Sequence, residues 1–221
     1  MKISLLTLLL MAALFQSTHA QRSQLRFGAR IGGNISFLSD NFMMLDQKRT
    51  PSFGGYVGGF VNISLSDAWS VQPEVQYVIE SGKFAGEFYL MSDNGKPLDK
   101  VIVTTRHQVA LLRVPMLVQW HTGSFKAGRV GVVAGPVGSY ISSVINYNDA
   151  DRELGSFPIS YENDWDNFAK QFQFGITAGV EYYITDNLSV DIRGMYSITS
   201  HLQEPLRASL SSLSLGAGYR F

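Results

Sequence analysis

The chain carries few of the residue types that perform acid–base or nucleophilic chemistry. Beyond its apolar N-terminus it has three histidines, and it has no cysteine. His201, beside Ser200 and near Ser209, is the combination that could supply a base and a nucleophile for modifying a lipid. No H-E-x-x-H, P-loop or G-x-S-x-G motif is present. We therefore predict that the protein is not an enzyme and uses no cofactor, with lipid modification as a less favoured alternative.

A second group of residues offers charge pairing rather than catalysis. These side chains fall on the polar positions of segments in which apolar and polar residues alternate. Eight strands enclose a space just wide enough for side chains, and mixed charges inside it would pair because an unpaired buried charge is costly. We predict a charge network that plugs the lumen of a barrel, which disfavours a small-solute channel. Its members are Arg26, Arg30, Glu74, Arg113, Glu181, Asp191, Arg193 and Arg220.

The segment 142–168 combines acidic and aromatic residues. Carboxylates such as those of Asp149, Asp151 and Glu153 suit hard cations, but their spacing matches no calcium loop, and we predict no metal site. Exposed aromatic side chains often mark protein contacts. The predicted contact residues are Tyr147, Phe157, Tyr161, Trp165 and Phe168.

The elements that position these residues are predicted to be β-strands, because period-2 alternation dominates the sequence. In the last run, from Leu213 to Phe221, every second residue is apolar. A tilted strand needs about 9–11 residues to cross a bilayer, and each predicted strand is that long. The eight strands are predicted at 25–38, 53–65, 69–81, 107–121, 127–141, 169–184, 188–200 and 209–221.

Short and long connections alternate between these strands. The short turns are predicted at Ser66–Ala68, Thr122–Lys126 and Thr185–Asn187, and the long segments at 39–52, 82–106, 142–168 and 201–208. Short periplasmic turns and long external loops describe an all-β, eight-stranded, antiparallel up-and-down transmembrane β-barrel of the outer membrane. Both termini then lie on the periplasmic side.

The apolar positions predict a wall that faces lipid. Aromatic residues gather near both ends of the strands, as in the interfacial girdles of membrane barrels, whereas a soluble barrel would be polar there. Those near the short turns are Phe27, Trp69, Trp120, Tyr182, Tyr219 and Phe221, and those near the long segments are Phe37, Phe53, Tyr77, Tyr140, Phe172 and Tyr196.

Three prolines complicate this pattern. Pro73, Pro115 and Pro136 fall inside predicted strands, and a closed barrel has no free edge for a residue without an N–H. We predict bulges or register irregularities at these positions.

The N-terminus reads as a cleaved signal peptide over residues 1–20, with Lys2, the apolar run Ile3–Phe15 and a small-residue site at Thr18-His19-Ala20. The barrel domain is then residues 21–221. Equal numbers of acidic and basic residues, 18 each, argue against nucleic-acid binding. No later apolar stretch is long enough for a membrane-spanning helix.

The chain resembles the PorT-like outer-membrane β-barrel family over its mature length. The segments that carry the resemblance are Phe27–Ser36, Trp69–Glu74, Leu112–Leu117 and Leu215–Phe221. The resemblance implies the barrel fold and a C-terminal aromatic signal, Tyr219 and Phe221, for the barrel insertion machinery. For some members it also implies work in type IX protein secretion and gliding.

Two functional hypotheses follow. The first is a non-enzymatic outer-membrane component that acts through loop-mediated protein contacts in type IX secretion or envelope assembly. Its expected partners are membrane lipid, the insertion machinery and secretion-apparatus proteins. The second is a stand-alone surface barrel for adhesion or envelope integrity.

Overall fold

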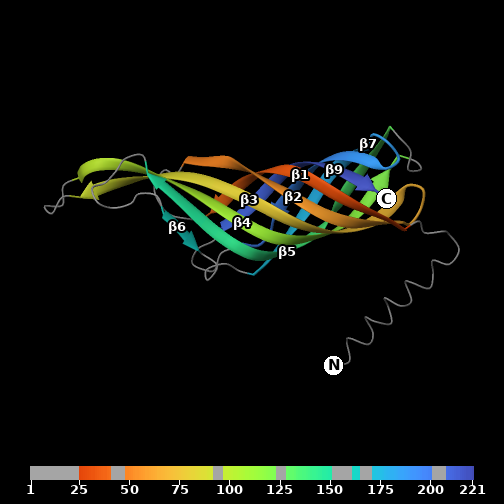
Figure 1. Cartoon of the computed structure of the whole chain (residues 1–221), viewed down its shortest axis with the longest axis horizontal. Helices are drawn as coiled ribbons and strands as arrows, with labels where there is room; N and C mark the ends of the chain where they lie inside the picture. The colour runs from red at the N-terminus through yellow and green to blue at the C-terminus, as the bar shows by residue number, and fades with distance from the viewer. Residues whose placement is uncertain are drawn as a thin grey trace, which may run out of the picture.

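The computed structural model describes residues 25–40, 48–91, 97–122, 128–150, 161–164, 171–200 and 208–221. These residues form nine β-strands, shown in Figure 1. Their bounds are β1 Leu25–Asp40, β2 Lys48–Ser64, β3 Trp69–Met91, β4 Pro97–His121, β5 Arg129–Ala150, β6 Tyr161–Asp164, β7 Phe172–Tyr183, β8 Leu188–Ser197 and β9 Ala208–Arg220. The predicted signal peptide lies outside the described residues.

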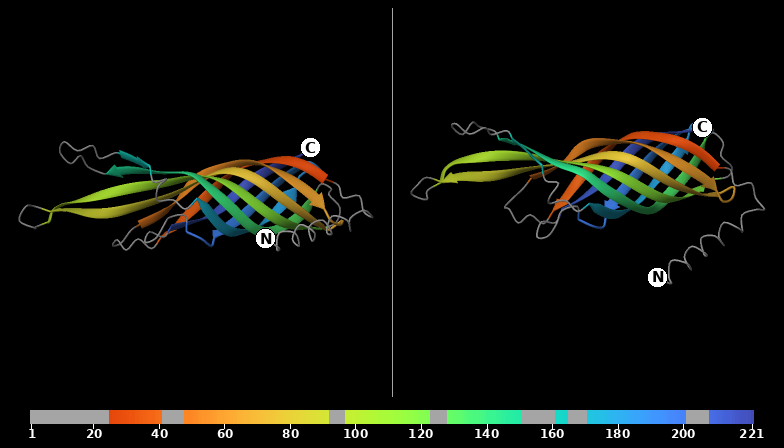
Figure 2. Two further views of the ribbon diagram at one scale, coloured as in Figure 1. Left: turned by 90° about the horizontal axis from the view of Figure 1, so that it is seen from below. Right: turned by 60° about the horizontal axis from the view of Figure 1, so that its bottom comes forward.

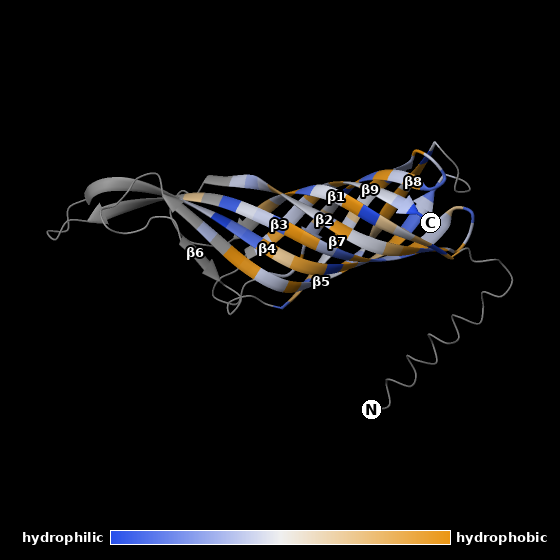
Figure 3. Ribbon diagram, viewed as in Figure 1, coloured by the Kyte–Doolittle hydropathy of each residue, from blue (hydrophilic) through white to orange (hydrophobic). Residues whose placement is uncertain are grey.

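Alternating residue types produce the strands. Along β7, Phe172, Phe174 and Ile176 are exposed, while Gln173 and the residues at every second position after it turn inward. The alternation of hydrophobic and hydrophilic residues runs along the wall of the barrel in Figure 3. Side chains of a strand point to opposite faces in turn, so one parity of each strand fills the interior and the other forms the outer wall.

Eight of the strands close into an antiparallel barrel. Each pairs with its neighbours in chain order, and β1 pairs with β9, for example Arg30 with Gly218. Pairing of β4 with β5 and of β5 with β7 completes the ring. The predicted eight-stranded up-and-down barrel is therefore confirmed, and both ends of the described chain lie at the end with short turns (Figure 1).

Two of the short turns are built alike. The Ser66 Oγ accepts hydrogen bonds from the backbone N–H groups of Ala68 and Trp69, at 3.3 and 3.1 Å. The Thr185 Oγ1 accepts from Asn187 and Leu188 in the same way, at 3.2 and 2.9 Å. A hydroxyl that satisfies two backbone donors stabilises a tight reversal. The third predicted turn falls mostly outside the described residues.

The predicted long loops at 82–106 and 142–168 are wrong over much of their length. Strands β3 and β4 continue as one hairpin, paired from Ser81–Gln108 out to Met91–Pro97. Strand β5 continues to Ala150, and the ninth strand, β6, pairs with it. Together they form a sheet that projects beyond the barrel at the end opposite the short turns (Figure 2). The sequence analysis did not predict these continuing strands, because apolar residues fall on both parities of this region and the period-2 alternation is lost.

The predicted irregularities at Pro73, Pro115 and Pro136 are also wrong. The register on both sides of each proline is the same, so these residues interrupt ladder bonds locally without displacing the pairing. Register shifts occur instead between Pro51 and Gly55 in β2 and at two other points in the sheet. No described helix has the length and apolar character to cross a membrane.

Candidate functional site

Five charged side chains meet in the middle of the lumen and are called the charged cluster here: Arg30, Glu74, Glu181, Asp191 and Arg193. Arg30 donates to Asp191 through Nη1 and to Glu181 Oε1 through Nη2, the latter at 3.1 Å. Arg193 donates from Nη1 to Glu74 Oε1 at 2.9 Å, and its Nε lies 2.9 Å from Asp191 Oδ1. All five side chains are buried. Each carboxylate therefore faces at least one guanidinium, as a buried charge requires.

Amide and hydroxyl groups complete this cluster. Glu74 accepts from the Nε2 atoms of Gln72 and Gln76 at 2.7 and 2.5 Å. Glu181 accepts from Gln119 Nε2 at 2.6 Å and from Ser189 Oγ at 2.6 Å. These donors come from β3, β4 and β8, so the network ties together strands on different sides of the ring.

The remaining predicted lumen residues occupy other places. Arg220, near the short-turn end, donates to the Tyr183 hydroxyl and stacks over that ring at 4.3 Å. Arg113 Nη2 donates to Glu80 Oε1 at 2.8 Å. Arg26 is half-buried, opposite Asn62 in the register of β1 and β2. The structure thus brings five of the eight predicted residues into one cluster and distributes the other three along the barrel.

Glu80 is a buried lumen carboxylate that the sequence analysis did not name. It accepts from Arg113 and from Ser212 Oγ, the latter at 2.6 Å. Its signal was available, because Glu80 lies on the same parity of β3 as Glu74. Its place on the polar parity of the predicted strand 69–81 was sufficient to predict that its side chain lies in the lumen.

The lumen is not polar throughout, although the sequence analysis predicted only a charge network inside it. Seven buried residues form an apolar cluster: Tyr56, Val78, Val109, Leu111, Ile141, Val144 and Leu210. Tyr56, Val78, Leu111 and Ile141 stand side by side in register across β2, β3, β4 and β5. This cluster lies nearer the projecting sheet than the charged cluster does; on β3, for example, Val78 lies further along the strand than Glu74. Runs such as Ala110-Leu111-Leu112, apolar on both parities, are the sequence signal for this cluster.

Glycine makes room for the one ring in this cluster. A Cβ on Gly216 would lie 2.0 Å from the Tyr56 hydroxyl, and one on Gly32 would lie 2.6 Å from its ring. The absence of a side chain at Gly32 and Gly216 lets the Tyr56 ring of β2 approach the backbone of β1 and β9 closely.

A Ser–His contact inside the lumen has no access to substrate. His121 Nε2 lies 3.2 Å from Ser70 Oγ, and both residues are almost fully buried. Ser70 also donates to Gln119 and accepts from Asn62. This histidine thus belongs to the polar filling of the lumen. His201, the histidine that the sequence analysis considered for lipid modification, lies outside the described residues.

Buried side chains fill much of the described lumen. A cavity of about 30 Å³ lies where the charged and apolar clusters meet. One water needs about 10–15 Å³, so the cavity is far too small to serve as a passage. Within the described residues, no group of three or more acidic, histidine or cysteine side chains could hold a metal ion.

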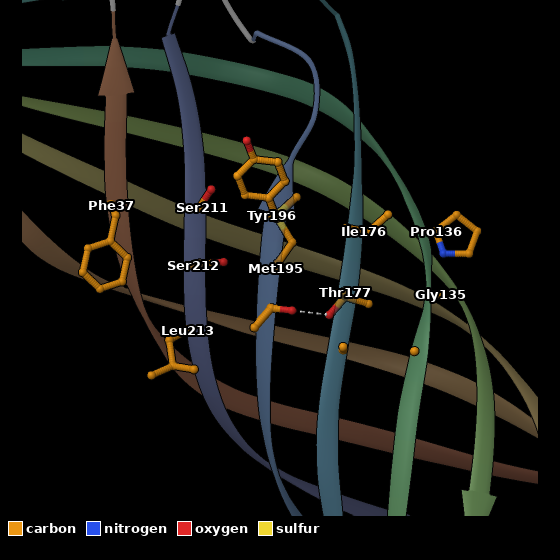
Figure 4. Close-up of a pocket in the computed structure, with 13 residues that line it drawn as sticks. Phe37, Gly135, Pro136, Ile176, Thr177, Met195, Tyr196, Ser211, Ser212 and Leu213 are labelled. Carbon is orange, nitrogen blue, oxygen red and sulfur yellow. Dashed lines mark hydrogen bonds between the residues drawn. The ribbon is translucent and has the colours of Figure 1, made fainter.

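The outer wall is apolar. All twelve aromatic residues predicted for the two girdles are exposed on it, which confirms that prediction. Tyr219 and Phe221 lie there with their rings edge to face, 5.7 Å apart. An open groove of about 680 Å³ crosses β1, β5, β7, β8 and β9 next to the girdle residues Phe37 and Tyr196, with Pro136 and Ile176 on the same side as Tyr196 (Figure 4). An apolar wall between aromatic margins is the surface that a bilayer covers.

Among the predicted contact residues, Tyr147 is exposed on β5 and pairs with Glu162 of β6. Tyr161 begins β6, opposite Asn148. Phe157, Trp165 and Phe168 lie outside the described residues. Two of the five thus belong to the projecting sheet.

Comparison with known proteins identifies a family. A family model described as "outer membrane protein beta-barrel domain" matches residues 16–203. No curated protein sequence matches the chain.

Three solved structures illustrate the similarity. Neisserial surface protein A is 14% identical, covers 88% of this chain and 97% of its own, and has a TM-score of 0.45. Ail, the attachment invasion locus protein of Yersinia pestis, crystallised with the heparin analogue sucrose octasulfate, is 14% identical, with coverages of 90% and 99% and a TM-score of 0.42. OprG from Pseudomonas aeruginosa is 14% identical, with coverages of 90% and 97% and a TM-score of 0.38.

Proposed function

Because the chain belongs to the outer membrane protein beta-barrel domain family, we propose that it is a non-enzymatic barrel that works through protein contacts on its projecting sheet. The protein resides in the cell outer membrane. Short turns face the periplasm in such barrels, so the projecting sheet is on the outside of the cell.

The observation that carries this proposal is the length of the β3–β4 hairpin. Strands β3 and β4 contain 23 and 25 residues. A tilted strand needs about 9–11 residues to cross a bilayer, so each of these strands is roughly twice that length. Glu80 of β3 still contacts Ser212 of β9 inside the lumen. The residues from Ser81 to Met91 continue beyond Glu80 and, at about 3.3 Å per residue, extend roughly 36 Å.

The hairpin also offers a free backbone edge. Pairing of β2 with β3 begins at Lys48 and Ala85. Among the described residues, the next six of β3, Gly86–Met91, pair with β4 alone. This stretch contains neither proline nor lysine, the residues that usually protect an exposed edge. Unpaired N–H and C=O groups on such an edge can add a strand from another protein.

Two biological roles are compatible with these contacts. The resemblance to PorT-like proteins supports a role in type IX secretion or envelope assembly, with secretion-apparatus proteins as partners. A stand-alone role in adhesion or envelope integrity would use the same surface. The filled lumen supports both over a solute channel, because neither needs a passage through the barrel.

The test is a barrel with a shortened hairpin. Residues 87–102 are replaced by Asn-Gly, a two-residue hairpin turn, so that Gly86 and Val103 become the last pair. Tagged full-length and shortened proteins are purified from native membranes in mild detergent, and bound proteins are identified by mass spectrometry.

We expect the shortened barrel to insert normally and to lose the partners that the full-length protein retains. A matched control replaces Asp186 in the opposite turn with alanine and should keep them. Secretion components among the lost partners would support the export setting, and host or envelope proteins the surface setting. Retention of every partner by the shortened barrel would contradict the proposal.

A further inference from the structure

The cavity between the two clusters is lined by cationic, hydroxyl and amide groups together with Pro115, Val137 and Met195. Arg193 comes from the charged cluster, Tyr56 from the apolar cluster, and Arg113 from the wall between them. The cavity measures about 30 Å³. Since one water needs about 10–15 Å³, there is room for one or two atoms of that size.

Most polar side chains of the lining already have partners within the protein. Ser212 Oγ donates to Glu80 at 2.6 Å, and Ser214 Oγ donates to the Arg193 carbonyl at 3.2 Å. Thr177 Oγ1 donates to the Gly194 carbonyl at 2.9 Å. Asn34 Nδ2 donates to the carbonyl of Ile79, and Gln76 donates to Glu74.

Arg193 Nε lies 2.9 Å from Asp191 Oδ1 as an ion pair. Three other donor atoms of the lining have no partner among the protein atoms described: the Tyr56 hydroxyl, Arg113 Nε and Arg193 Nη2. Their residues are only 8%, 7% and 5% exposed. A buried donor without an acceptor costs roughly 1–3 kcal/mol, and more when it is charged. The lining atoms without any partner are therefore donors carried by two cations and one phenol, whereas the hydroxyls of Thr177, Ser212 and Ser214 already take part in hydrogen bonds.

We propose that this cavity binds one monoatomic anion, such as chloride. An anion accepts hydrogen bonds from all three groups at once, and hydrogen bonds that involve a charge are about twice as strong as neutral ones. A water molecule would also have to direct its own hydrogens toward acceptors, and the three unpartnered groups offer chiefly donors. Polyatomic anions, such as sulfate with its five heavy atoms, exceed the volume.

The bound ion joins the two halves of the lumen filling. It links a guanidinium of the charged cluster to the single hydroxyl of the apolar cluster. Folding of the barrel thereby becomes coupled to the halide concentration, since a ligand that binds only the folded state stabilises it by mass action.

The first test is crystallographic. The folded full chain is crystallised with bromide in place of chloride, and anomalous scattering is recorded at the bromine edge. We expect an anomalous peak inside the cavity, within contact distance of Tyr56, Arg113 and Arg193. Ordered density without an anomalous signal there would identify water and overturn the proposal.

The second test is a comparison of two tyrosine variants. Unfolding by urea is measured in chloride and in gluconate, which is too large for the cavity, at equal ionic strength. With chloride at about ten times its Kd, the folded-to-unfolded ratio should rise about tenfold over that in gluconate. Tyr56→Phe should raise the chloride Kd by about tenfold. Tyr77→Phe, which removes the same group from the lipid-facing wall, should leave it unchanged.

Equal stability in both salts would overturn the proposal, as would a full chloride effect in Tyr56→Phe. If that variant does not fold, the bromide experiment on the unchanged chain still decides the question.

Discussion

The charged and apolar clusters fill the same lumen by different physical means. In the charged cluster, Arg30 reaches Glu181 and Asp191 on strands that lie more than 150 residues further along the chain. In the apolar cluster, Val78, Leu111 and Ile141 come from three successive strands. The first depends on pairing opposite charges after the ring closes. The second, apart from Leu210 of β9, depends on filling volume among strands that are already neighbours.

The two clusters should therefore lose stability in different ways when their residues are substituted. Removing one member of a buried ion pair leaves its partner uncompensated, so the cost is large and specific to the partner. Removing methyl groups from an apolar cluster costs an amount that grows with the cavity left behind. Variants in each cluster can separate these two behaviours.

The largest effect is expected from Arg30→Met. This change leaves Glu181 and Asp191 without their shared guanidinium and should lower the free energy of unfolding by about 3–5 kcal/mol. Urea unfolding of the barrel in phospholipid vesicles measures it. Lys83→Met, at an exposed position of β3, is the control and should change stability by less than about 0.5 kcal/mol. A loss below about 1 kcal/mol for Arg30→Met would show that the pairing contributes little.

A smaller effect is expected from Leu111→Ala in the apolar cluster. Leu111 is fully buried in the lumen, and the next residue, Leu112, is 42% exposed on the outer wall. The first substitution should cost about 2–4 kcal/mol, and Leu112→Ala less than about 1 kcal/mol, because lipid fills the space. The same unfolding experiment compares the two. Equal losses at both positions would contradict the assignment of a packed apolar cluster.

The smallest effects are expected from glycine substitutions on the two faces. Gly216→Ala would push the Tyr56 hydroxyl out of place and should cost about 1–3 kcal/mol through overpacking. At Gly194, on the outer wall, an added Cβ meets nothing closer than 4.0 Å, and alanine should change stability by less than about 0.5 kcal/mol. Heat-dependent gel mobility and urea titration both report the difference. A stable Gly216→Ala barrel would show that Tyr56 can move freely.

The sequence predicted which residues of a strand face inward and which face outward, but it did not predict the ends of the strands. It placed Arg30, Glu74 and Asp191 inside and Phe172 outside, as the structure does. It did not show where strands end: β3 continues ten residues past the predicted end at 81, and β4 begins ten residues before the predicted start at 107. The prediction of irregularities at the prolines was wrong because a missing N–H removes only one hydrogen bond. The hydrogen bonds on either side of it keep the register unchanged.

The sequence by itself determined the strands, their inward and outward faces, the aromatic margins and the up-and-down order, because these depend on residues close together along the chain. Tertiary structure alone decided which charge meets which, since Arg30 and Asp191 become neighbours only when β1 pairs with β9. It also decided that an apolar cluster occupies part of the lumen and that a donor-lined cavity separates it from the charges. Such contacts depend on how the strands are staggered around the closed ring, which no single segment of the chain encodes.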